Sequence, residues 1–180
     1  MNVAAALKGQ YHAALAALKQ TVDECPAKLW AASGHPSQFW QVAYHALFFT
    51  HLYLQPNEEA FRPWEHHRDE YQFLEALPWP PHRPPKLAES YTQDEVLEYW
   101  RVCDAMIDPG VDRLDLEASD CGFWWYKMPK LDHQIMNIRH IQEHAAQLEE
   151  RIRSATGNPP TWVGGNTGKV EFPQQANGDS

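Results

Sequence analysis

The run from residue 29 to residue 57 contains no charged side chain, and this absence limits how the chain can fold. On a helix, residues 37–54 are apolar nearly all round, through Phe39, Trp40, Val42, Ala43, Ala46, Leu47, Phe48, Phe49 and Leu52. Other elements must cover most sides of such a helix. The run does not fit a membrane span, because it is short and is interrupted by Gln38, Gln41, His45, His51 and Gln55. We therefore expect a helix buried at the centre of an all-α domain.

Three further segments have helical signals. Apolar residues repeat at helical spacing over residues 2–23, and Pro26 is expected to end that helix. Thr92 and Glu95 form a capping-box pattern at the start of a third helix, which Pro109 is expected to stop. Residues 130–154 form the fourth. The sequence therefore predicts four helices of bundle length.

The connections between these helices predict their order in space. The short loop 26–36 favours antiparallel packing of the first two helices as neighbours. Seven of the fourteen prolines lie in the long segment 56–91, although residues 61–73 could form a short helix. We expect a four-helix bundle over residues 1–156, with a long crossover between helices 2 and 3. Residues 157–180 form an irregular tail that could dock through Trp162, Val170 and Phe172.

Composition limits the functional classes. The formal net charge is −9 and no basic cluster is present, which argues against a nucleic-acid partner. Nothing indicates a membrane span or a secretory signal. The three cysteines, Cys25, Cys103 and Cys121, form no CxxC pair and no disulfide framework. These features favour a cytoplasmic protein.

Polar residues share the inward side of the predicted helix 130–154. One arc carries five charged residues, Arg139, Glu143, Glu149, Glu150 and Arg153. The opposite side carries Ile141, Ala145, Leu148 and Ile152. His133, Asn137, His140 and His144 lie beside this apolar stripe, with Gln147 at its edge. Buried polar groups need partners, because each one left unpaired costs about 1–3 kcal/mol. Either a metal ion or mutual hydrogen bonding among metal-free core histidines would provide them.

A metal site follows from the histidine spacing. His140 and His144 are four residues apart on one helical face, although ten histidines in 180 residues give roughly half such a pair by chance. His45 lies at the middle of its own helix, and His51, roughly 9 Å further along the axis, is the fallback ligand. Three imidazoles leave a coordination position open, as in catalytic metal sites. Asn137, Gln147 and His133 are candidates to orient the ligands or a bound water.

The stretch Asn137-Ile-Arg-His140-Ile-Gln-Glu-His144-Ala-Ala-Gln147-Leu148 resembles the last core helix of the DinB-like (YfiT-like) superfamily. Tyr44-His45-Ala46 matches the histidine that this family carries in its second helix. The resemblance implies a four-helix bundle that holds a divalent metal, commonly zinc or nickel, on three histidines. It also implies frequent homodimers. Characterised members include S-transferases and isomerases that use low-molecular-weight thiols.

These observations favour a metal-dependent enzyme that activates water or a small thiol towards a small-molecule substrate, as a hydrolase or a thiol S-transferase. Two alternatives are a non-catalytic metal- or ligand-binding bundle and a structural bundle with metal-free histidines. A site at mid-bundle needs limited access of bulk water, which the long crossover and the loop 123–126 could provide. We expect at least one aromatic residue of these loops to line the pocket, from Trp64, Trp79, Trp124, Trp125 and Tyr126.

Overall fold

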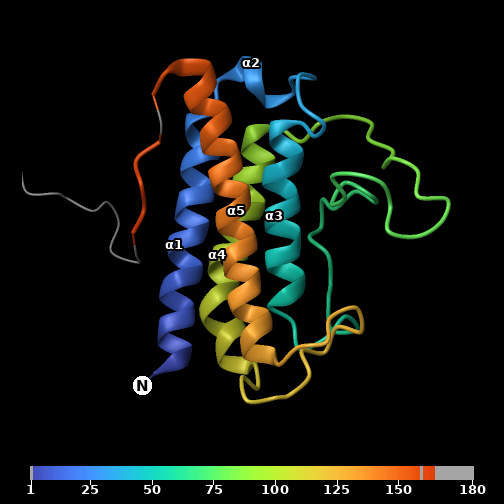
Figure 1. Ribbon diagram of the computed structural model, residues 1–180, viewed down its shortest axis with the longest axis vertical. Coiled ribbons are helices and arrows are strands. Elements are labelled where there is room, and N and C mark those ends of the chain that lie inside the picture. The colour runs from blue at the N-terminus through green and yellow to red at the C-terminus, as the bar shows by residue number, and fades with distance from the viewer. Residues whose placement is uncertain (1, 159, 165–180) are drawn as a thin grey trace, which may run out of the picture.

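The computed structural model describes residues 2–158 and 160–164. Over these residues the chain is all-helical and contains no strand, which confirms the predicted all-α class. The helices are α1 (Val3–Glu24), α2 (Ala27–Trp30), α3 (Phe39–Tyr53), α4 (Gln93–Arg113) and α5 (Lys130–Thr156), and the four long ones run side by side (Figure 1). Each of the four long helices was expected from the sequence, whereas the short α2 was not.

The four long helices pack in a specific order. α1 packs mainly against α5 and α4, and α3 packs against the same two helices. α1 and α3 have few contacts with each other, so the expectation that they pack as direct neighbours is wrong. The connection between them contains α2 and is long enough to cross the end of the helices. These contacts are compatible with a four-helix bundle.

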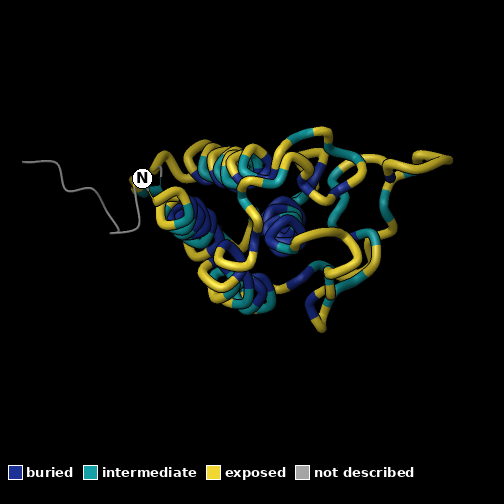
Figure 2. The backbone as a smooth tube through the Cα atoms, turned by 90° about the horizontal axis from the view of Figure 1, so that it is seen from below, coloured by how far each residue is buried: buried dark blue, intermediate teal, exposed yellow. Residues whose placement is uncertain are grey.

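Burial follows the sequence pattern. An end-on view shows that buried residues lie where the helices face one another, while exposed residues form the outer sides and the loops (Figure 2). α3 is buried along almost its whole length, as its uncharged sequence predicts. Within α3, only His45 and Phe49 are partly accessible. These two residues are therefore the places where this central helix meets a surface opening.

The ends of α4 show one prediction confirmed and one corrected. Thr92 and Glu95 form the expected capping box. Pro109 does not end the helix, which continues for another turn to Arg113. Proline removes only one backbone donor, and packing after it offsets this loss: Gly110 lies against Leu54, and Val111 is buried.

The crossover, residues 54–92, contains no helix, so the short helix expected at 61–73 is wrong. The chain there is instead held by hydrogen bonds to its carbonyl oxygens from side chains of α3 and of Ser37, two residues before α3. Ser37 donates to Leu74 at 2.8 Å, Gln41 donates to Phe73 at 2.7 Å, and His45 contacts the Gln72 carbonyl at 2.6 Å. The proline-rich segment is thus attached along one side of α3.

Four remaining features complete the fold. No described helix is both long and apolar enough to cross a membrane. Cys25, Cys103 and Cys121 are buried free thiols. α5 ends before Gly157, whose positive φ of 79° closes the helix. Trp162 in the tail is exposed, whereas Val170 and Phe172 lie outside the described residues.

Candidate metal centre

Packing of α3 against α5 brings together the three predicted histidines. The Nε2 atom of His140 lies 3.0 Å from Nε2 of His45 and 3.1 Å from Nε2 of His144. All three ligand nitrogens lie within 4.8 Å of one another. Nitrogens bound to one tetrahedral zinc ion are roughly 3.3 Å apart, given Zn–N bonds of about 2.0–2.1 Å. The cluster therefore has the dimensions of a three-histidine metal site.

The hydrogen bonds of the Nδ1 atoms determine which imidazole nitrogens can bind a metal. Nδ1 of His45 lies 2.6 Å from the backbone oxygen of Gln72, and an oxygen only accepts, so this nitrogen carries the proton. The Nε2 atom of His45 then presents a lone pair to the cluster. Nδ1 of His144 lies 3.1 Å from the side-chain oxygen of Gln147, which fixes the same tautomer there.

His140 cannot satisfy both neighbours by hydrogen bonding. A neutral imidazole has one N–H, so Nε2 of His140 can donate to His45 or to His144 but not to both. If it donates to either, its own Nδ1, which is buried without a partner among the described residues, is left as an unsatisfied acceptor. If the proton sits on Nδ1, three lone pairs face one another at Nε2. A cation at the centre of the cluster removes this conflict, so the donor set fits a divalent metal.

Electrostatics keep the three imidazoles in the neutral form that binds metals. Burial, together with the neighbouring His140 and His144, lowers the pKa of His45 to about 3. Burial and the adjacent His144 lower the pKa of His140 to about 4. Burial also lowers the pKa of His144, although Gln147 and Glu143 act in the opposite direction. Protons therefore do not compete for these nitrogens at neutral pH.

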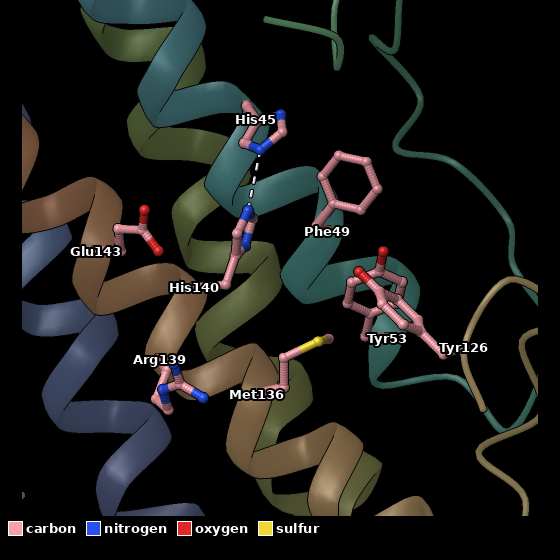
Figure 3. A pocket seen from close by; sticks show the side chains of 8 residues that line it. All are labelled: His45, Phe49, Tyr53, Tyr126, Met136, Arg139, His140 and Glu143. Carbon is pink, nitrogen blue, oxygen red and sulfur yellow. Dashed lines mark hydrogen bonds between the residues drawn. The ribbon is translucent and has the colours of Figure 1, made fainter. Parts of the chain in front are cut away.

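A pocket of about 260 Å³ opens beside the cluster. His45 and His140 lie in its lining, so an open coordination position would face this space (Figure 3). The apolar and aromatic walls are Phe49, Tyr53, Tyr126 and Met136. Arg139 and Glu143 of α5 complete the lining.

The three residues expected to support the ligands have different positions. Gln147 contacts His144, as described above. Asn137 instead donates to the Tyr11 hydroxyl at 3.0 Å, on the side of α5 that faces α1. His133 is buried among Tyr53, Phe123 and Tyr126, and its Nε2 has no partner among the described residues. Nδ1 of His133 lies 3.4 Å from Nε2 of Gln134. Among the described residues, neither Asn137 nor His133 therefore forms a side-chain hydrogen bond with a metal-site histidine.

The fallback ligand His51 also lies elsewhere. Its Nδ1 is 3.1 Å from the Tyr99 hydroxyl, and burial lowers its pKa to about 4. His51 is two turns from His45 on the same helix and is absent from the ligand group that the structure forms. Through its hydrogen bond to Tyr99, His51 is part of the contact between α3 and α4.

Of the five aromatic residues expected at the pocket, Tyr126 lines it. Trp64 is buried and stacks on Tyr99 at a ring-centroid distance of 4.7 Å, so it belongs to the core. Trp79 and Trp124 are exposed. Trp125 is half-buried against Phe123. The loop 123–126 therefore reaches the pocket, whereas none of the crossover tryptophans is part of its lining.

Sequence reasoning missed Arg139 and Glu143, which a helical projection assigns to the solvent-facing arc of α5. Both are exposed, yet both line the pocket, because the pocket is at the edge where α5 meets α3. Their positions next to His140 and His144 in sequence were the available signal.

Comparisons with protein-family models, with curated proteins and with solved structures found no match to this chain.

Proposed function

We propose that this protein is a metal-dependent enzyme in which His45, His140 and His144 hold one divalent ion and leave a coordination position open to the pocket. The observation that supports this proposal best is the convergence of three neutral Nε2 atoms that one shared proton cannot satisfy. When bound, a zinc or nickel ion would supply Lewis acidity, which lowers the pKa of a water or thiol ligand towards neutrality. The reaction class is therefore hydrolysis or thiol S-transfer on a small molecule.

The surrounding residues have separate roles in this proposal. The Gln72 carbonyl and the Gln147 side chain orient two of the ligands by accepting their Nδ1 protons. Tyr53, Tyr126, Phe49 and Met136 surround the reacting molecule and limit bulk water beside it. Glu143, which lies next to the ligand His144 in sequence, adds a carboxylate to the pocket lining.

The resemblance to DinB-like proteins supports the same proposal. It agrees with a four-helix bundle with a long crossover, with three histidines on its second and last long helices, and with a low-molecular-weight thiol as co-substrate. A homodimer in the cytoplasm is part of this proposal. The net charge of −9 supports a small-molecule rather than a nucleic-acid substrate.

Metal analysis tests the site directly. Wild-type protein supplemented with zinc or nickel should contain about one ion per chain, and a His45→Ala, His140→Ala, His144→Ala variant should contain none. The matched control replaces three exposed histidines, His35, His66 and His82, by alanine and should keep its metal. This control also removes His66 from a second group of ligand-type side chains, with Glu65 and Glu98. Metal retained in the first variant, or absent from wild type, would overturn the proposal.

Turnover is tested separately on the metal-loaded protein. An activated ester is offered with and without a thiol such as cysteine, and release of the leaving group is followed. Release that needs only water identifies a hydrolase, and release that needs the thiol identifies an S-transferase. A loaded protein with neither activity would support the alternative of a non-catalytic metal-binding bundle.

A further inference from the structure

The pocket beside the metal site has two chemically different ends. His45, His140 and Glu143 lie towards one end, and Met136, Arg139, Tyr53 and Tyr126 lie towards the other (Figure 3). Arg139 and Glu143 are four residues apart on α5, so they are separated by about 6 Å along the helix axis. The pocket beside the three histidines therefore also contains a guanidinium group in its lining.

Arg139 is available to bind a ligand. Neither a hydrogen bond nor an ion pair joins it to another side chain among the described residues, although Glu143 is one turn away. Arginine followed four residues later by glutamate is the less favourable order for a helical ion pair. By contrast, Arg153 on the same helix is paired with Glu150 at 2.6 Å. Arg139 and Arg153 thus differ in whether a carboxylate already pairs with their charge.

The rest of this end of the pocket suits an apolar body with a polar group. Phe49 and Met136 provide apolar contact, and Tyr53 and Tyr126 add phenol rings. Burial and the neighbouring Tyr126 raise the pKa of Tyr53, so its hydroxyl keeps its proton and can donate a hydrogen bond. The tyrosine hydroxyls and the Arg139 guanidinium favour an anionic ligand group at this end of the pocket. The Glu143 carboxylate disfavours an anionic group at the other end.

We propose that Arg139 binds a carboxylate of the small molecule that reacts at the three-histidine site, and that this molecule carries an aromatic or similar apolar body. The reaction at the site rests on the proposed function, whereas binding of the carboxylate by Arg139 does not. A planar guanidinium can bind both oxygens of a carboxylate, which gives orientation as well as affinity. The net charge of −9 gives no general attraction to anions, so selectivity for a carboxylate depends on this local cation.

Calorimetric titration with phenylacetate and with its neutral isostere phenylacetamide tests the proposal. It uses the full chain, both metal-loaded and after metal removal, and compares wild type with Arg139→Gln. The control is Arg153→Gln, which removes the paired arginine of the same helix. We expect wild type and Arg153→Gln to bind phenylacetate about tenfold more tightly than phenylacetamide. Arg139→Gln should bind the two compounds within about threefold of each other, and Arg139→Lys should lie between.

The outcomes separate this proposal from the metal site. A wild type without preference for phenylacetate overturns it, and so does an Arg139→Gln variant that keeps the preference, because a group other than Arg139 would then bind the carboxylate. A wild type that binds no metal overturns the proposed function alone, since the titration of metal-free protein still measures the dependence on Arg139. Circular dichroism and metal content of each variant show that the fold and the site are intact.

Discussion

Two clusters of polar side chains on the inward side of α5 differ in their hydrogen bonding. In its first half, Gln134 and Asn137 face α1: Tyr11 donates to Gln134 at 2.8 Å and accepts from Asn137 at 3.0 Å. In its second half, His140 and His144 face His45 of α3. Amide and hydroxyl groups each offer a donor and an acceptor, so the first cluster forms hydrogen bonds across the helices. Among the three imidazoles of the second cluster, no arrangement of protons pairs every nitrogen, and one cation could bind all three Nε2 atoms. A single unpaired atom does not indicate a metal, because Oδ1 of Asn137 is also buried without a partner among the described residues. The convergence of three ligand nitrogens is what distinguishes the second cluster.

The largest expected effect concerns the histidine cluster alone. Metal at a thousandfold excess over its dissociation constant should stabilise the native state by about 4 kcal/mol. For a chain of this size, that raises the melting temperature by about 8–16 °C. Thermal unfolding with and without metal should show this rise in wild type and no rise in His140→Ala. Tyr11→Phe, in the other cluster, should keep the full rise from a lower starting temperature. Equal shifts in wild type and His140→Ala would contradict the difference between the clusters.

Acid sensitivity also tests a buried imidazole of α5 that is not a candidate metal ligand. Burial, together with the nearby Lys130, lowers the pKa of His133 to about 4. The unfolded chain takes up this proton near pH 6.5, so it binds more protons than the native state between about pH 6.5 and 4. The free energy of unfolding must therefore fall as the pH falls through this window, by up to about 3 kcal/mol for this group.

Urea unfolding of metal-free protein across this pH range measures that fall. His133→Phe, which preserves the aromatic contacts with Tyr53 and Phe123, should show a smaller loss on acidification than wild type. His51→Phe serves as a second case, since burial lowers the pKa of His51 to about 4 as well. Identical pH profiles for wild type and both variants would show that neither imidazole is held neutral by the fold.

Removing one hydroxyl from the hydrogen-bonded cluster should cost less. Tyr11→Phe leaves the donor of Asn137 and the acceptor of Gln134 unpaired inside the protein. The expected loss is about 2 kcal/mol in the free energy of unfolding, measured by urea titration. Metal content should not change, because Gln134, Asn137 and Tyr11 make no side-chain hydrogen bond to His45, His140 or His144 among the described residues. A loss of metal in Tyr11→Phe would mean that the two halves of α5 are not independent.

The smallest expected effect is on ligand orientation. Gln147→Ala removes the acceptor for Nδ1 of His144 and should weaken metal binding about tenfold, at the lower end of such effects because Gln147 is exposed. Gln142→Ala, on the same helix, is the matched control and should leave affinity unchanged. Competition with a metal-binding dye gives both affinities. If the two variants bind metal equally, Gln147 does not fix the ring.

The sequence allowed the helices and the three histidines to be predicted because both depend on local rules. Helical projection identified which side of α5 points inward, and mid-helix position paired His45 with His140. The same projection cannot tell which neighbouring helix a side chain faces, so it did not separate Asn137, which meets Tyr11, from His140. It also assigned Arg139 to solvent, because a pocket edge depends on how α5 and α3 are placed. Pro109 was misjudged because packing of Gly110 against Leu54 depends on tertiary structure.

The hydrogen bond between His45 and the Gln72 carbonyl makes the proline-rich crossover part of the metal site. The free energy needed to order residues 54–92 is thereby linked to the affinity for metal, and thermodynamic reciprocity applies in both directions. A change in the crossover that favours its detached form weakens the site, even when all three ligands remain. Conversely, an ion on the histidines favours the attached form by the same factor. The metal affinity of the three histidines would thus depend on the folding of a segment that contributes no ligand.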